Sequence, residues 1–184
     1  MDLDVTCLYK TVKEKGYKFF PTYLWLVTRN LCKQQEFKIA IKDDKLGYFD
    51  TLTPLYATWH EDTKTFSFLW TEYKEDFEAF YNDYLKNQMD FGNNHGILGQ
   101  PGVPPENAYT VSALPWVDFK HFAVHSFENK AYFLPSIEAG KYQREGNQII
   151  MPLSITCHHA TTDGWHIARF LEDLKGDIED LPLV

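Results

Sequence analysis

The sequence is short of cysteine and has no long apolar run, and each shortage excludes a class of protein. Its three cysteines, Cys7, Cys32 and Cys157, stand apart without a CxxC pair, so neither a disulfide framework nor a zinc knot is expected. Apolar stretches such as 23–27 are too short to cross a bilayer, and the N-terminus lacks the basic and apolar regions of a secretion signal. We therefore expect a soluble, cytoplasmic protein with free thiols and no membrane contact.

Positive charge is also scarce. The chain carries 18 Lys and Arg against 26 Asp and Glu, a formal net charge of −8, and no basic run could grip a phosphate backbone. Neither GxxxxGKS/T nor GxGxxG occurs, which argues against a phosphate-binding loop. The pair Asp43-Asp44 lacks the ligand spacing of a calcium loop and is interpreted as a solvated turn. Nucleic acid and metal are therefore not expected partners.

Apolar and aromatic residues, by contrast, are plentiful. Hydrophobic residues make up 44% of the 184 positions, with 14 Phe, 11 Tyr and 5 Trp. This is the composition of one globular domain with a substantial core. Because helical and strand patterns are mixed, with no internal repeat and no linker, we expect a single α/β domain over 1–184. Its architecture is predicted to be a two-layer sandwich, in which helices cover a large mixed β-sheet.

The pattern of apolar residues predicts the individual elements. A first helix is expected to begin at an Asp4 N-cap and to end at Gly16. The other predicted helices cover about 21–34, about 75–89, and a final segment from Gly164 to near Gly176. Strands are predicted over 37–41, 46–49, 55–59, 65–69, 108–112, 121–127, 132–134, 137–142 and 148–158. The first two strands should form a hairpin, and the Gly- and Pro-rich stretch 92–107 should be a loop.

Two histidines stand where a predicted strand meets the last helix. His158 and His159 directly follow the apolar part of the strand, 148–156, and Asp163 precedes the helix, where it could cap the helix or fix a neighbouring side chain. Adjacent residues on a strand point to opposite faces, so one histidine should face the interior and the other a site. The same divergence argues against a Cys157–His158 nucleophilic pair and favours a buried structural thiol. The alternative for the histidines is a pair satisfied by core hydrogen bonds.

The string 158–170, His-His-Ala-Thr-Thr-Asp-Gly-Trp-His-Ile-Ala-Arg-Phe, resembles the HHxxxDG signature of chloramphenicol acetyltransferases and, more remotely, of dihydrolipoyl acyltransferases. Further matches fall in the family's order and approximate spacing: Phe20-Pro21, Glu36-Phe37, His60-Glu61, Thr65-Phe66-Ser67, Leu69-Trp70, Ser112, Pro115-Trp116, Gly140-Lys141-Tyr142 and Met151-Pro152-Leu153. The resemblance implies a CoA-dependent acetyltransferase, built as a homotrimer with active sites between subunits, whose co-substrate is acetyl-CoA and whose acceptor is chloramphenicol. An antibiotic-resistance role would follow.

The resemblance also implies roles for named residues. His159 would be the general base that removes the proton of the acceptor hydroxyl, and the Ser112 hydroxyl would stabilise the tetrahedral oxyanion. The residues themselves give Ser112 a plainer reading, a serine at a strand end with no GxSxG elbow around it. Asp163 matches an aspartate that holds the family's site through a salt bridge.

Aromatic residues would line the two substrate sides. Trp116 and Tyr142 match aromatics on the CoA side, and Phe66 and Phe133 would help to form the acceptor side, with plain core packing as the alternative for all four.

The sequence departs from the family at several positions. Thr161-Thr162 replaces the usual middle residues of the signature, and Phe68 occupies a usually small position beside the acceptor. Glu138 stands where a threonine is usual, and an ionised carboxylate there would oppose a developing negative charge unless it were paired or turned outward. These changes leave open a different small hydroxyl acceptor.

Family members carry several dozen residues before the helix expected near Asp4, including an arginine that pairs with the signature aspartate. The chain is therefore interpreted as N-terminally shortened. A third hypothesis follows from this interpretation, an inactive relic that keeps the fold.

Overall fold

The computed structural model describes residues 1–123 and 132–183. The helices are α1 (Thr6–Lys15), α2 (Phe19–Cys32), α3 (Phe77–Phe91) and α4 (Gly164–Glu179), with a short 3-10 helix η1 (Gln35–Lys38). The strands are β1 (Asp2–Asp4), β2 (Ile39–Lys42), β3 (Lys45–Tyr48), β4 (Thr53–His60), β5 (Thr65–Trp70), β6 (Ala108–Leu114), β7 (Ser136–Gly140), β8 (Gln143–Glu145) and β9 (Gln148–Thr156).

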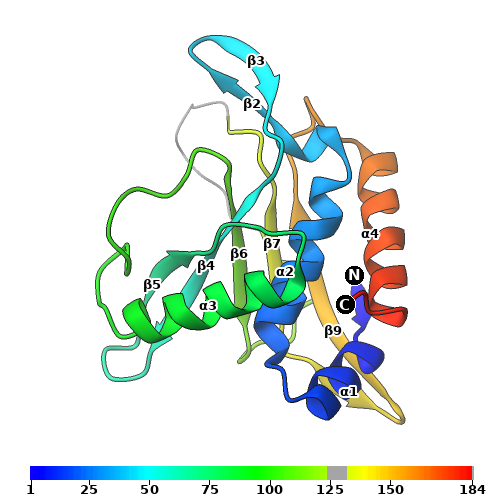
Figure 1. The fold of residues 1–184 in the computed structure, drawn as a ribbon. Coiled ribbons are helices and arrows are strands. Elements are labelled where there is room, and N and C mark those ends of the chain that lie inside the picture. The colour runs from blue at the N-terminus through cyan, green and yellow to red at the C-terminus, as the bar shows by residue number, and fades with distance from the viewer. Residues whose placement is uncertain (124–131, 184) are drawn as a thin grey trace.

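A mixed sheet forms the centre of the molecule (Figure 1). Its strands follow the order β1-β9-β7-β6-β4-β5, and β8 pairs with β9 beyond this path. The pairs β4–β6 and β6–β7 are parallel, and the other pairs are antiparallel. The prediction of a large mixed sheet covered by helices is therefore confirmed.

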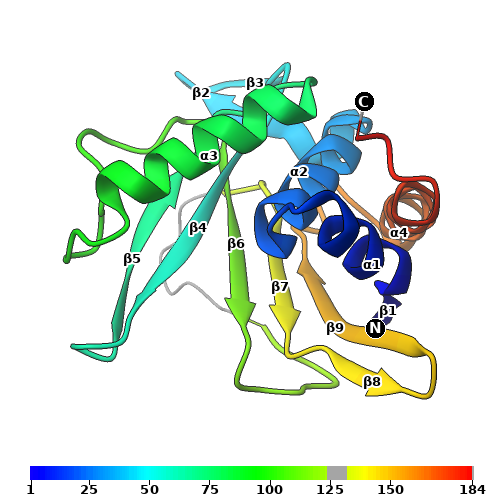
Figure 2. The same ribbon diagram turned by 60° about the horizontal axis from the view of Figure 1, so that its bottom comes forward.

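The helices cover one face of the sheet (Figure 2). Strand alternation explains the layering: Tyr56, Tyr109 and Val111 point to this face and are fully buried. Helix α2 supplies much of the core, because ten of its 14 residues are buried among the sheet, α3 and α4. The opposite face keeps partly exposed side chains such as Ala57 and Ser112, so the two faces differ in their access to solvent.

A hairpin formed by β2 and β3 projects from one end of the molecule (Figure 1). Its turn residues Asp43 and Asp44 both have positive φ, 51° and 58°. Positive φ at both central residues is what a type I′ two-residue hairpin turn requires, and aspartate tolerates it better than most residues. The prediction of a hairpin across this acidic pair is confirmed.

The N-terminal prediction is wrong in detail. Residues Asp2–Asp4 form strand β1, which pairs with 150–152 of β9, and the N-cap of α1 is Val5. The Asp4 side chain forms a local hydrogen bond, in which its Oδ1 accepts from the Thr6 backbone N–H at 2.9 Å. The helix ends as predicted at Gly16, whose φ of 76° is the left-handed conformation that glycine adopts most easily.

The remaining differences lie in the C-terminal half. Residues 121–123 and Tyr132–Leu134 form no strand, whereas 124–127 of the first of these predictions lie outside the described residues. Strand β8 is too short and polar to show a strand pattern, and β9 ends at Thr156 rather than at His158. Helix α4 runs past Gly176, because an interior glycine costs a helix only about 1 kcal/mol.

In the described part of the chain, no helix is both long enough and apolar enough to span a bilayer.

Candidate functional site

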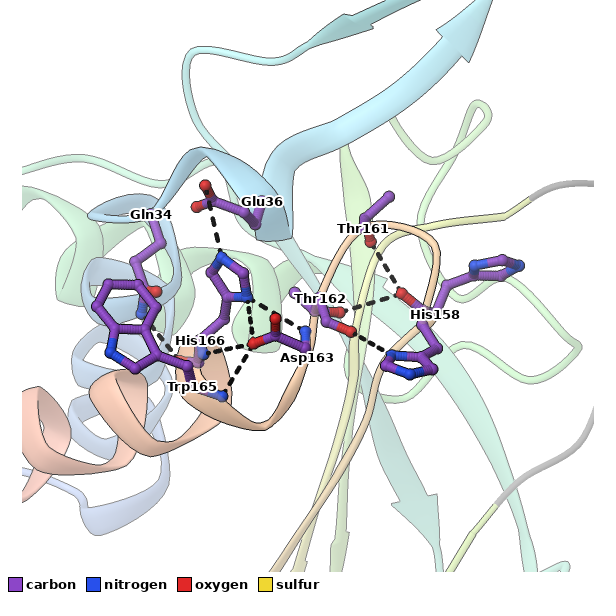
Figure 3. A network of polar contacts seen from close by, with 9 residues as sticks. Gln34, Glu36, His158, Thr161, Thr162, Asp163, Trp165 and His166 are labelled. Carbon is purple, nitrogen blue, oxygen red and sulfur yellow. Dashed lines mark hydrogen bonds and ion pairs between the residues drawn. The ribbon is translucent and has the colours of Figure 1, made fainter.

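The turn between β9 and α4 is built around one carbonyl oxygen. The His158 carbonyl accepts hydrogen bonds from the backbone N–H groups of Thr161 and Thr162, at 3.0 and 3.2 Å. It also accepts from their hydroxyls, at 3.0 and 3.2 Å (Figure 3). The two threonines of the signature therefore fix the turn from both backbone and side chain. A threonine pair is suited to this position because each residue supplies two donors.

The same turn fixes the tautomer of the neutral His159 ring. Its Nδ1 lies 3.1 Å from the carbonyl oxygen of Thr162. A carbonyl oxygen can only accept, so Nδ1 carries the hydrogen and donates it. In the neutral imidazole, Nε2 is then left with a free lone pair. The backbone thus holds His159 in the tautomer that can act as a base through Nε2.

The prediction that one histidine of the pair faces the interior is wrong. Both His158 and His159 are exposed, because β9 ends at Thr156 and the pair lies in the turn, where strand alternation no longer applies. His158 folds back on its own backbone, accepting from the Ala160 N–H at Nδ1 over 3.1 Å. Its ring lies edge-on to Phe133, with ring centroids 4.8 Å apart. Phe133 is thus placed beside the turn.

Asp163 caps the helix that follows. Its Oδ1 accepts from the backbone N–H groups of Trp165 and His166, at 2.9 and 3.4 Å. Partial desolvation raises the pKa of Asp163, but the two N–H groups and the nearby His166 outweigh it, so the pKa is lowered. The side chain is 57% exposed, and His166 is its ion-pair partner among the described residues. Asp163 therefore caps α4, and no arginine in the described part of the chain forms an ion pair with it.

His166 completes the cap and was not singled out by sequence reasoning. The Asp163 backbone N–H donates to its Nδ1 at 3.2 Å, so the neutral ring presents its Nε2–H toward Glu36, 3.7 Å away (Figure 3). Nδ1 also lies 2.9 Å from the Asp163 carboxylate, a contact that the protonated ring would make instead. The Gln34 amide donates to the His166 carbonyl at 3.3 Å. The usable signal was Asp-x-x-His at a helix start, a variant of the capping box.

Ser112 lies on β6, two strands away from β9 in the sheet order. It pairs in register with Glu138 of β7, which in turn pairs with Ser154 of β9. Paired residues share a face, so these three side chains form a row on the sheet face opposite the helices. No hydrogen bond joins Ser112 to His159 in residues 1–123 and 132–183. Within one chain the two predicted catalytic residues are therefore separate.

Glu138 is almost fully buried, with 1% of its surface exposed. The Thr110 hydroxyl donates to Ser136 Oγ at 2.9 Å, and Ser136 Oγ donates to Glu138 Oε1. The other oxygen, Oε2, has no hydrogen-bond partner in the described part of the chain. Burial raises the pKa of Glu138, and the bond from Ser136 offsets this only in part.

The predicted aromatic residues fall into separate groups. Trp116 packs on Trp59 with ring centroids 4.7 Å apart. Phe66 and Phe68 of β5 contact each other at 5.2 Å, and Phe66 pairs in register with Trp59. These four side chains lie together on the sheet at β4 and β5. Trp59, Phe66 and Trp116 are 40%, 50% and 59% exposed, so plain core packing does not account for these three side chains.

Tyr142 packs on a different set of aromatic rings. It contacts Tyr9 and Phe19, at 5.6 and 6.1 Å between ring centroids, and is 42% exposed. No aromatic contact joins it to Trp116 among the described residues. The segments that carry the two residues are nevertheless neighbours, because the Lys141 backbone N–H donates to the Val117 carbonyl at 2.8 Å.

A cavity of about 350 Å³ lies between the β2–β3 hairpin and the segment before β7. Phe133 and Tyr132 line one side, and Lys42 and Glu106, an ion pair, line the other. Because Phe133 also touches His158, this cavity borders the histidine turn.

Cys157 is partly buried, and burial raises the pKa of its thiol to about 11. It is therefore protonated near neutral pH and is not a nucleophile there. In residues 1–123 and 132–183, no group of three His, Cys, Asp or Glu side chains could hold a metal ion.

Comparison with known proteins places these features in a family context. The family model described as chloramphenicol acetyltransferase matches residues 1–175. A chloramphenicol acetyltransferase of Clostridium perfringens is 42% identical over 165 residues, which are 89% of this chain and 79% of that protein. Another, of Staphylococcus aureus, is 38% identical over 182 residues, covering 98% of this chain and 83% of the relative. Among solved structures, a chloramphenicol acetyltransferase superposes with a TM-score of 0.81 at 22% identity, covering 97% of this chain and 86% of that one, which supports the fold.

Proposed function

The chain belongs to the chloramphenicol acetyltransferase family, and from this premise we propose that it transfers the acetyl group of acetyl-CoA to a hydroxyl group of chloramphenicol. The observation that supports this most directly is the hydrogen bond in the turn between β9 and α4 that leaves His159 Nε2 unprotonated in the neutral ring. A neutral imidazole is a competent base near neutral pH and contributes about 10²–10⁴-fold to the rate.

The proposed reaction proceeds in a ternary complex without an acetyl-enzyme. His159 Nε2 takes the proton of the acceptor hydroxyl while its oxygen attacks the thioester carbonyl carbon. The tetrahedral intermediate then collapses, the carbon–sulfur bond breaks, and the imidazolium returns its proton to the CoA sulfur. Throughout, the hydrogen bond from Nδ1 to the Thr162 carbonyl keeps the ring oriented.

Ser112 is proposed as the donor to the oxyanion. Its hydroxyl has no hydrogen-bond partner in the described part of the chain, and its side chain is neither fully buried nor fully exposed, so it is free to donate. One such donor is worth about 10²–10³-fold in kcat. The Ser112 and His159 of one chain do not touch, which is consistent with a site that two chains complete.

We further propose a cytoplasmic homotrimer with its sites between subunits. The exposed aromatic cluster of Trp59, Phe66 and Trp116 supports this, because such side chains are enriched in protein interfaces and ligand sites. Phe66, Phe68 and Phe133 are proposed to line the acceptor side. Trp116 and Tyr142 are proposed for the CoA side, where the segments that carry them are joined by the hydrogen bond from the Lys141 N–H to the Val117 carbonyl.

A different small hydroxyl acceptor is a second candidate. Phe68 contacts Phe66 and so occupies volume on the proposed acceptor side, and the buried Glu138 adds a polar group beside Ser112. Phe68 replaces a residue that is usually small, and Glu138 replaces a usual threonine. Both replacements change the shape and polarity of the pocket.

The test is to mix wild-type protein with acetyl-CoA and either chloramphenicol or a panel of small alcohols, and to identify the products by mass spectrometry while following CoA release. Acetylchloramphenicol formed with the highest kcat/KM supports the proposal. A better acceptor in the panel would favour the second candidate. If no acceptor were acetylated and no CoA were released, both candidates would be refuted and the hypothesis of an inactive relic would stand.

A further inference from the structure

A single peptide group connects two histidine rings in the turn between β9 and α4. The Thr162 carbonyl accepts from His159 Nδ1 at 3.1 Å. The N–H of the same peptide bond, which belongs to Asp163, donates to His166 Nδ1 at 3.2 Å. This peptide bond is trans, so its carbonyl and its N–H point in opposite directions. The two hydrogen bonds therefore form a bridge between His159 and His166, with one ring at each end of the peptide group.

The bridge decides how the peptide group is oriented. Thr162 and Asp163 lie between strand β9 and helix α4, so no regular hydrogen-bond pattern fixes the peptide bond that joins them. In residues 1–123 and 132–183, its carbonyl and its N–H make no hydrogen bond besides the two of the bridge. Because a peptide group is a rigid plane, holding its N–H at one end also sets the direction of its carbonyl at the other.

His166 is itself firmly held. It is the third residue of α4, and its carbonyl accepts from the Gln34 side-chain amide at 3.3 Å. The Trp165 ring packs edge-on against its ring, with ring centroids 5.3 Å apart. The side chain is 19% exposed, and its Nε2 faces Glu36 Oε1 at 3.7 Å (Figure 3). The ring is therefore a fixed point against which the turn can be aligned.

We propose that His166 is a positioning residue for the general base. Its neutral ring anchors the Asp163 N–H, this fixes the carbonyl of Thr162, and the carbonyl in turn orients the His159 ring with Nε2 free for the acceptor hydroxyl. The inference rests on the proposed function. It gives His166 a role in the reaction besides its contribution to the helix cap.

The bridge also adds to the strength of the base. Its hydrogens all point away from His159, from Nδ1 to the carbonyl and from the peptide N–H to His166. Hydrogen bonds in such a chain polarise one another, so the carbonyl becomes a stronger acceptor. A stronger acceptor at Nδ1 stabilises the charge that His159 gains when it takes the proton. Glu36 continues the chain, but its side chain is 38% exposed and 3.7 Å away, so we expect its share to be small.

The bridge belongs to the neutral form of His166. The charged groups around its ring are Asp163 of the turn, Glu36 of η1 and, one turn further along α4, Arg169, which stacks on Trp165. A protonated ring would donate from Nδ1 to Asp163 Oδ1, 2.9 Å away. The peptide N–H would then lose its acceptor, so protonation of His166 should open the bridge.

The test compares His166→Gln with His166→Leu. Glutamine is a usual residue at this capping position, and its side-chain oxygen can accept from the Asp163 N–H, whereas leucine offers no acceptor. We expect His166→Gln to keep most of kcat and His166→Leu to lose about 10-fold, since misplacing a reacting group by 1 Å can cost about 10²-fold. KM for both substrates should change little, and each variant is assayed below its unfolding midpoint.

Nitrogen NMR without substrate separates positioning from mere capping. At a pH where both rings are neutral, the wild type should show His159 protonated on Nδ1 and His166 protonated on Nε2. A coupling across the hydrogen bond should join the Asp163 amide nitrogen to His166 Nδ1. In His166→Leu the His159 ring should become a mixture of tautomers, and in His166→Gln it should not. The control is His121→Leu, an exposed histidine outside the turn, which should keep both kcat and the His159 tautomer.

Three outcomes would overturn the inference. They are a His166→Leu variant with wild-type kcat, a His166→Gln variant as slow as His166→Leu, and a folded His166→Leu variant in which the His159 tautomer is unchanged. The spectra separate this inference from the proposed function. An active enzyme whose spectra lack the bridge refutes the role of His166 alone, whereas a wild type that acetylates no acceptor refutes the proposed function and the role of His166 in it.

Discussion

Replacing Ser136 by alanine is expected to destabilise the protein, and to do so more strongly at mildly alkaline pH than at acidic pH. Ser136 Oγ is the described donor to the carboxyl of Glu138, whose side chain is 1% exposed. The substitution removes this donor and leaves Thr110 Oγ1 without its acceptor.

The magnitude follows from the charge on Glu138. A hydrogen bond between neutral groups contributes about 0.5–1.5 kcal/mol, and one to a charged group contributes about 1.5–3 kcal/mol. The loss should therefore be about 1 kcal/mol while Glu138 is protonated and about 2 kcal/mol once it is ionised.

The expected increase of this destabilisation with pH agrees with the thermodynamic linkage between protonation and folding. The pKa of Glu138 is raised in the folded protein, so its contribution to stability is present below the ordinary glutamate pKa and is lost as pH rises through the folded-state value. Without Ser136 the folded-state pKa rises further, and the loss of stability with pH becomes larger.

The assay is urea unfolding of wild type and Ser136→Ala at an acidic and a mildly alkaline pH, compared as differences in the free energy of unfolding at each pH. Ser154→Ala is the matched control on the neighbouring strand. Its hydroxyl donates to the Phe122 carbonyl at 2.6 Å, a neutral acceptor, so its loss should not depend on pH. An equal loss for Ser136→Ala at both pH values would refute the reasoning.

Three further predictions concern the site and its cysteines. Ser112→Ala should lower kcat by about 10²–10³-fold with little change in the unfolding midpoint, measured by CoA release and thermal unfolding. Asp163→Ala should lower both kcat and the unfolding midpoint because α4 loses its cap, whereas Asp163→Asn should retain the midpoint because asparagine also caps; equal midpoints in the two variants would contradict the capping role. In a thiol-reagent time course near neutral pH, the exposed Cys7 should react first and Cys157 slowly, because its pKa is about 11; rapid reaction of Cys157 would show that the thiol is accessible as a thiolate.

Local sequence patterns predicted most of the fold. The hairpin across Asp43-Asp44, the strands β4 and β5 and the helix α3 all have strong local signals, and all are present. Strand β1 was missed for two reasons. Its pairing partner in β9 lies almost 150 residues away in the chain, and a strand of three residues is too short to show an alternating hydrophobic pattern. Strand β9 ends early because the two histidines belong to a turn that Thr161 and Thr162 hold.

The site was predictable in its residue types but not in its hydrogen bonds. The HHxxxDG string pointed to the histidine turn, yet the tautomer of His159 depends on where the Thr162 carbonyl points, which only the folded turn decides. The exposure of Asp163 and its role as a cap likewise follow from the start of α4 at the next residue. The environment of Glu138 depends on the register of β6, β7 and β9, which no local pattern specifies.

The central claim is that His159, and not its neighbour His158, is the general base of acetyl transfer. The most direct test is kcat at saturating acetyl-CoA and chloramphenicol for His159→Ala and His158→Ala, with thermal unfolding to show that both variants are folded. We expect His159→Ala to lose about 10²–10⁴-fold and His158→Ala far less, since the Nδ1 of His158 bonds only to its own turn. A His159→Ala variant that retains wild-type kcat, or a larger loss in His158→Ala, would contradict the claim.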